Sequence, residues 1–171
     1  MAETKSVGAK PAKAPRPLVG LAAGIAAGLV ASAAMAAFQH QAEKLVPDAG
    51  KDDAEPATVK AADLVHTAAT GLPVPAGHRA AAGQGVHYLV GGVLGGIYGV
   101  LTEYRPEARS GFGTAYGIAT AALLDEGAVP AAGLAPAPDA APVASHAYGA
   151  ASHLVYGLVL EGVRMLLAGR R

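Results

Sequence analysis

The chain has 171 residues, and its 13 basic and 13 acidic residues sum to a formal net charge of zero. Charged residues make up only 15% of the sequence, against about 25% in a typical soluble domain, and alanine and glycine are abundant. This composition excludes extended disorder, which requires high net charge, and a nucleic-acid partner, which requires a basic excess. The lack of cysteine excludes disulfides, zinc ribbons and a cysteine nucleophile.

Residues 1–17 are rich in lysine, proline and alanine and are predicted to form a disordered, basic cytoplasmic tail. No charge then occurs between Arg16 and Glu43. Because a helix needs about 20 mostly apolar residues to cross the hydrocarbon layer of a bilayer, residues 18–38 are predicted to span a membrane. Small residues recur at every fourth position of this helix, which places them on one face for packing against another helix. They are Gly20, Gly24 and Gly28.

The first apolar segment has an alternative interpretation as a cleavable signal peptide. A basic N-terminus, an apolar run from Leu18 to Val30 and small-residue triplets at 31–33 and 34–36 fit such a signal. The apolar segment continues past both triplets to Phe38, and this continuation favours a retained helix.

Residues 39–82 are predicted to form a loop on the outer side of the membrane. Within it, residues 57–70 follow a proline and precede Gly71, in agreement with the residue preferences of helix starts and stops. Leu64 and Val65 contribute to a weakly apolar side, so we expect this short helix to lie on the membrane surface.

Three further segments with few charges are predicted to cross the membrane, at residues 83–103, 111–129 and 143–167. Residues 18–168 then form one all-α domain of four transmembrane helices. A soluble alanine-rich bundle is the alternative, but so much glycine would weaken a helix in water. The second and third spans also carry small residues at four-residue spacing, which are predicted to pack against neighbouring helices. They are Gly91, Gly95, Gly99, Gly113 and Gly117.

The basic residues determine the expected orientation. Nine of them lie in the two termini and in the connection between the second and third spans, and four lie in the loop 39–82. Because cytoplasmic loops carry an excess of lysine and arginine, both termini are predicted to be cytoplasmic, including the short basic end 169–171.

The second and fourth spans share a sequence pattern. A Tyr-Gly dipeptide begins at Tyr98 and again at Tyr156, and a glutamate follows five residues after each tyrosine, at Glu103 and Glu161. The first two spans and the last two are therefore predicted to be two related helical hairpins in a parallel repeat.

Three segments resemble the YagU-like family of small bacterial inner-membrane proteins. They are His87 to Glu103 with Pro106, the glycine-led third span before Pro130, and Ser152 to Arg164. The resemblance implies a polytopic helical fold in the bacterial inner (cytoplasmic) membrane. That family has no assigned reaction, and its best-known member is linked to acid tolerance. The resemblance thus implies a location and a fold type more than an activity, and a role in acid or envelope stress is the functional expectation that it offers.

In the predicted topology, ionisable residues gather in the outer half of the helix bundle. Such residues are costly inside a membrane and often mark a functional site. Imidazoles titrate near neutral pH, and together with carboxylates they bind protons or a divalent metal, while two facing imidazoles ligate haem. The candidates for proton or ligand binding are His87, Asp125, Glu126, His146 and His153.

The alternative for this group is that the histidines bind backbone or lipid headgroups at the membrane interface and that the carboxylates lie at the water boundary. At the inner end of the bundle, two glutamates lie near arginines, and helix-end ion pairs are predicted. The residues concerned are Glu103, Arg105, Glu161 and Arg164.

The sequence contains no phosphate loop, dinucleotide-binding glycine pattern, His-Glu-x-x-His or nucleophile elbow, so no enzymatic activity is predicted. The leading hypothesis is a proton-sensitive His/carboxylate cluster that needs no cofactor. The second is a membrane redox component that binds a divalent metal or haem through His87 and His146. The third is a structural subunit whose glycine faces pack in a homo-oligomer or against other membrane subunits. The lipid bilayer is an expected partner in all three.

Overall fold

The computed structural model describes residues 14–45 and 55–169, and over these residues it contains helices and no strands. The all-α prediction is therefore confirmed for this part of the chain. The element η3 is a π-helix, and the other η elements are short 3-10 helices. In chain order the elements are α1 (Pro17–Leu45), α2 (Ala57–Thr70), η1 (Ala76–His78), α3 (Arg79–Tyr104), η2 (Pro106–Arg109), α4 (Thr114–Leu123), η3 (Leu124–Ala128), α5 (Val129–Ala131), η4 (Pro138–Ala140) and α6 (Val143–Ala168).

Among the described residues, three helices are long and apolar enough to cross a membrane: Pro17–Leu45, Ala76–Tyr104 and Val143–Ala168. They correspond to the first, second and fourth predicted spans. The loop predicted to begin at residue 39 begins later, because α1 continues to Leu45. Gln, Ala, Glu and Lys at 41–44 are strong helix formers, and charge there does not end a helix that extends beyond the hydrocarbon layer.

The predicted third span, residues 111–129, is not one regular α-helix. α4 has 10 residues, and η3 and α5 continue it to Ala131. The five residues of η3 include Asp125 and Glu126, and the helix is not among the three that are long and apolar enough to cross a membrane. A π-helix has one extra residue in its turn, so it changes the direction of the side chains that follow.

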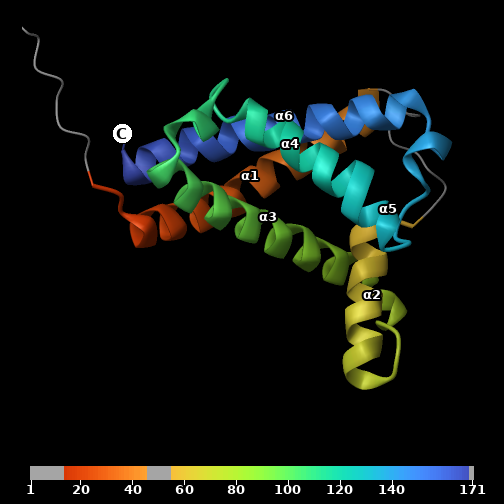
Figure 1. Cartoon of the computed structure of the whole chain (residues 1–171). Coiled ribbons are helices and arrows are strands. Elements are labelled where there is room, and N and C mark those ends of the chain that lie inside the picture. Colours follow the sequence, from red (N-terminus) through yellow and green to blue (C-terminus); the bar gives the residue numbers. More distant parts are fainter. Residues whose placement is uncertain (1–13, 46–54, 170–171) are drawn as a thin grey trace, which may run out of the picture.

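α1 is the central helix of the bundle. It packs against α3 and α6, while α4 packs on α6 and α2 on α3. Figure 1 shows the start of α1 beside the end of α6, and α2 at the opposite end of the bundle. We name these two ends the terminal end and the α2 end.

The backbones of α1 and α3 meet through glycine. An added Cβ on any of three α1 glycines would overlap a carbonyl oxygen of α3, because no side chain separates the two helices. Such close approach allows backbone van der Waals and Cα–H···O contacts between antiparallel helices. The facing pairs are Gly20 with Gly99, Gly24 with Gly95 and Gly28 with Gly91.

A second crossing of the same kind joins α4 to α6. A Cβ added to Gly113 would overlap the carbonyl oxygen of Gly157, and a Cβ added to Gly117 would overlap that of His153. Gly113 also has a φ of +84° just before α4, a conformation that is strained for residues with a side chain. All eight glycines predicted to be packing positions therefore lie at one of these two crossings.

The polarity of the bundle is the reverse of that of a soluble protein. Large apolar side chains cover the outside of the long helices, an arrangement that is unfavourable in water and suited to lipid. Exposed examples are Leu21, Leu29, Val93, Ile97, Leu158 and Leu166. The buried polar and charged residues are Ser32, Thr102, Thr120, Ser152, His153, Glu161 and Arg164.

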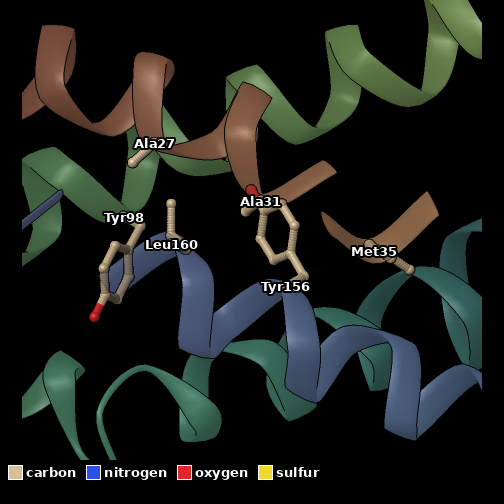
Figure 2. Close-up of a cluster of buried hydrophobic side chains, with 6 residues drawn as sticks. All are labelled: Ala27, Ala31, Met35, Tyr98, Tyr156 and Leu160. Carbon is tan, nitrogen blue, oxygen red and sulfur yellow. The ribbon is translucent and has the colours of Figure 1, made fainter. Parts of the chain in front are cut away.

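Six buried side chains from α1, α3 and α6 form the centre of the bundle (Figure 2). The small side chains of Ala27 and Ala31 on α1 leave room for the tyrosine rings of the other two helices, and Figure 2 shows Leu160 between those rings. The cluster consists of Ala27, Ala31, Met35, Tyr98, Tyr156 and Leu160.

We expect the membrane-inserted protein to keep α1. Ala31 is fully buried and Ser32 nearly so, both within the region where a signal peptidase would cut. Cleavage after residue 33 or 36 would remove the α1 half of the glycine crossing and, from the central cluster, at least Ala27 and Ala31. Intact-mass measurement of protein extracted from membranes tests this, and a mass that lacks residues up to 33 or 36 would establish the signal-peptide interpretation.

Candidate functional site

A cavity of about 750 Å³ lies at the α2 end, between α1, α2, α3, η3 and α6. His87 of α3, Asp125 of η3 and His153 of α6 are in its wall, whereas Glu126 and His146 are not among the lining residues. The five candidates from the sequence are therefore not one cluster. Three line the cavity, and two lie outside it.

Asp125 and His153 form a pair in the cavity wall. Oδ2 of Asp125 lies 3.2 Å from Nε2 of His153, and the two side chains are 41% and 8% exposed. Gly149 of α6 leaves space for the carboxylate, since an added Cβ there would lie 3.0 Å from Asp125 Oδ2. The pair thus connects a buried imidazole to a carboxylate that is accessible.

The hydroxyl of Thr120 determines where the proton of His153 lies. Thr120 Oγ1 is 2.7 Å from the carbonyl oxygen of Gly117, which only accepts, and therefore donates its single proton there. In its 3.2 Å contact with His153, the Thr120 oxygen must then be the acceptor, and Nδ1 of His153 must carry a proton and donate it. When the only proton of the imidazole is on Nδ1, Nε2 has a lone pair that repels the Asp125 carboxylate. The contact between Nε2 and Oδ2 is therefore attractive only if a second proton lies between these two atoms.

Glu126 and His146 form a separate, half-exposed pair. Nδ1 of His146 is 2.6 Å from Oε1 of Glu126, and its Nε2 is 3.1 Å from the carbonyl oxygen of Pro138. Both ring nitrogens face acceptors, an arrangement that favours the imidazolium form. This pair ties η3 and η4 to the start of α6.

His87 contacts the backbone of α1, with Nε2 3.2 Å from the carbonyl oxygen of Ser32. His87 and His146 therefore have different partners on different elements. Within residues 14–45 and 55–169, no three His, Asp or Glu side chains are arranged to hold a metal ion. The metal- or haem-binding hypothesis stays a prediction.

At the terminal end, Glu161 and Arg164 form a buried ion pair instead of the predicted helix-end pair. Arg164 donates from Nε and Nη2 to the two carboxylate oxygens, at 2.6 and 2.8 Å. Tyr98 of α3 donates to the same carboxylate at 2.9 Å. The side chains of Arg164 and Glu161 are only 2% and 5% exposed, so this charge pair lies inside the bundle.

Glu103 and Arg105 do not repeat this arrangement. Positions i and i+2 point to different sides of a helix, whereas i and i+3 face each other. Arg105 is exposed and forms no ion pair with the described residues. Glu103 instead accepts from the backbone N–H of Arg16 at 2.6 Å, and the Arg16 guanidinium donates to the carbonyl of Ala168 at 2.7 Å.

Ion pairs and hydrogen bonds hold α2 beside the cavity. Arg79 at the start of α3 donates to Glu55 and to Asp63, at 2.8 and 2.9 Å. The N–H of Val74, with a smaller contribution from Arg79, holds the pKa of Asp63 below its ordinary value. Lys60 on α2 donates to the carbonyl of Leu134 at 3.1 Å.

Several residues of the site were not predicted from the sequence. Thr120 and Gly149 determine the geometry of the Asp125–His153 pair, and Tyr98 completes the buried ion pair. The sequence indicates Tyr156 only through the Tyr-Gly repeat. In the structure its hydroxyl donates to the carbonyl of Gly91 at 2.7 Å. The repeated Tyr-Gly dipeptide is a signal for Tyr98, for Tyr156 and for Gly149, which follows Tyr148, while Thr120 has no local signal.

Comparison with known proteins adds no family to this picture. No family model matches the chain, and the searches of curated proteins and of solved structures gave no match. The resemblance to the YagU-like family therefore stays a prediction, and the function is inferred from the geometry of the site.

Proposed function

We propose that the chain is a pH-responsive, non-enzymatic membrane protein in which the Asp125–His153 pair binds a proton at the edge of the cavity. The observation that carries the proposal is the contact of Thr120 with Nδ1 of His153. That contact leaves Nε2 facing the carboxylate, where a proton is needed to make the 3.2 Å approach favourable. Imidazole is the side chain whose charge changes between about pH 5 and 8.

Release of this proton makes the contact between His153 and Asp125 repulsive. A lone pair on Nε2 and a negative carboxylate would repel each other, and Asp125 is the more exposed of the two. Its backbone lies in a π-helix, a form frequent at functional sites. We expect Asp125 to turn away from His153 toward the cavity when the proton leaves, so that η3 is the element that responds to pH.

The proposal includes a bacterial inner-membrane location, four spans and cytoplasmic termini. α4, η3 and α5 together cover residues 114–131, which at 1.5 Å per residue give a length near the roughly 30 Å of the hydrocarbon layer. Each of the proposed hairpins, α1–α3 and α4–α6, has a glycine crossing, which supports the idea that they are related. A role in acid or envelope stress, as in the YagU-like family, agrees with a proton-binding site.

The structural-subunit hypothesis receives less support. All eight predicted packing glycines contact helices of the same chain, so these faces are not available to a partner or to a second copy.

The proposed function predicts a pH response that depends on the pair. Between about pH 8 and 5, the protection of residues 124–131 against hydrogen exchange, corrected for the intrinsic exchange rate at each pH, should rise as the pH falls in full-length protein in lipid nanodiscs, because protonation closes the pair. His153→Gln and Asp125→Asn should abolish this change. The matched control is His40→Gln, because His40 is an exposed residue of α1 outside the cavity wall and its variant should keep the response.

The same variants are compared for survival of cells after acid exposure. If the triple variant with His87, His146 and His153 all changed to glutamine survives acid and responds to pH as the wild type does, the proposed function is wrong.

A further inference from the structure

The cavity at the α2 end has an excess of negative charge in its wall. Among the described residues, three carboxylates line it, those of Glu43, Glu55 and Asp125, against one lysine, Lys60. A concave site with low-dielectric walls and one predominant sign of charge concentrates ions of the opposite sign. The lining therefore favours a cationic ligand over an anionic one.

The three carboxylates differ in how they are bound. Glu55 accepts from the guanidinium of Arg79 at 2.8 Å, so its charge is already balanced. Glu43 is an exposed residue near the end of α1 and lines the rim of the cavity. Asp125 has only the imidazole of His153 as an ion-pair partner among the described residues. Asp125 is therefore the carboxylate that becomes available inside the cavity when His153 loses its proton.

The size and walls of the cavity fit a small organic molecule. Pockets of about 300–1,000 Å³ that are mostly apolar, with a few placed polar groups, are typical of ligand sites. This cavity has a volume of about 750 Å³, and Leu94, Val90, Tyr148 and Tyr156 are among its lining residues. Tyrosine rings attract cations through their negative faces. Ser32, which also lines the cavity, has a buried Oγ without a hydrogen-bond partner in the described structure.

We infer that the cavity binds an organic monocation with an apolar body, which replaces protonated His153 as the partner of Asp125. One cation enters and one proton leaves Nε2 of His153 for the solvent, so the total charge is unchanged. The inference rests on the proposed function, because the exchange uses the proton that the Asp125–His153 pair binds.

Other groups face the cavity but do not share this exchange. His87 of α3 binds the Ser32 carbonyl, and Lys60 of α2 binds the Leu134 carbonyl. In the described structure, Glu43 on α1 and Glu55 before α2 form no hydrogen bond or ion pair with His153, and Thr120 of α4 contacts only its Nδ1. A cation that binds Asp125 thus displaces the proton at Nε2 and no other.

Benzyltrimethylammonium is a suitable probe, and neopentylbenzene is its neutral isostere. Both are titrated by calorimetry into full-length protein in zwitterionic nanodiscs, with empty nanodiscs as the blank. We expect the cation to bind at least about tenfold more tightly than the isostere, because only the cation pairs with Asp125. Titration in two buffers of different ionisation enthalpy should show that protons are released as the cation binds, and the affinity for the cation should rise as the pH rises.

Three variants separate the roles of the residues. Asp125→Asn should bind the cation at least about tenfold more weakly, whereas His153→Gln should bind it without proton release and without pH dependence. Glu107→Gln is the matched control, because Glu107 is an exposed carboxylate of η2 and does not line the cavity. It should bind like the wild type. Near-UV circular dichroism of the tyrosines verifies that each variant is folded.

Failure of the cation site and failure of the proton-binding proposal would give different results. Equal affinity for the cation and its neutral isostere, or unchanged cation binding in Asp125→Asn, would overturn the cation site and leave the proton-binding proposal intact. Tight cation binding by the wild type without any proton release would overturn the role of His153, and with it the proposed function and the exchange.

Discussion

Replacement of Gly24 by leucine is expected to separate α1 from α3. The new Cβ would occupy the position of the Gly95 carbonyl oxygen, a backbone atom that has no rotamer to move to. The helix axes must then move apart along the whole crossing, and the neighbouring glycine contacts are lost as well. Overpacking at an ordinary core site lowers the free energy of unfolding by about 1–3 kcal/mol. For Gly24→Leu we expect this free energy to fall by more than about 3 kcal/mol.

Unfolding by sodium dodecyl sulfate, followed by near-UV circular dichroism, measures this loss. The tyrosine signal reports tertiary packing, because the rings of Tyr98 and Tyr116 lie 4.7 Å apart. Far-UV circular dichroism should change little, since each separated helix keeps its internal hydrogen bonds in an apolar medium.

The matched control is Gly85→Ala on α3, where an added Cβ meets no atom within 4 Å. Its unfolding free energy should lie within about 0.5 kcal/mol of the wild type. If Gly24→Leu unfolds with the same free energy as this control, α1 and α3 do not meet through glycine.

The second large effect is expected from Arg164→Met. This change keeps the apolar stem of the side chain and removes the guanidinium, so Glu161 stays buried without its cation. Breaking a buried ion pair by removal of one partner typically costs about 3–5 kcal/mol. The double variant Glu161→Gln with Arg164→Met should recover most of this loss, because the neutral amide still accepts from Tyr98.

Unfolding free energies of the two single variants and the double variant give the coupling energy. Arg79→Met is the matched control, because it breaks pairs with Glu55 and Asp63 that are far more exposed. Exposed pairs contribute about 0–1 kcal/mol, so the control should lose no more than this. A loss for Arg164→Met that does not exceed the control would mean that the buried pair contributes nothing to stability.

The long helices were predictable because burial of charge in lipid is costly and leaves gaps in the charge pattern. Three such gaps coincide with α1, α3 and α6. The eight packing glycines were also predictable, since a four-residue spacing places small residues on one face whatever the partner is. The partner itself was not predictable, because a glycine face has no side chains that specify what it meets.

The partners within the candidate site were not predictable from spacing. The sequence placed His146 and His153 on one face of a helix, but which carboxylate each one meets depends on the rotation of α4. The π-helix sets that rotation, and it gives Asp125 to His153 and Glu126 to His146. A π-helix depends on one backbone register shift and leaves no composition signal.

The repeat in the sequence predicted equivalent roles for Glu103 and Glu161, and the structure separates them. Arginine follows Glu161 after three residues and Glu103 after two, and only the first spacing allows a pair on a helix. A difference of one residue therefore decides which glutamate is buried and which contacts the backbone at the start of α1.

The central position of α1 has a consequence for biogenesis. α1 is synthesised before every helix that it packs against, and the Arg16 side chain meets its acceptor on Ala168 only after 152 further residues. At about 5–20 residues per second, this delay lasts on the order of 10–30 s. The glycine face of α1 meets α3 earlier, but the side of α1 that packs against α6 has no partner helix during that time. The packing of α1 is therefore completed only after α6 has been synthesised.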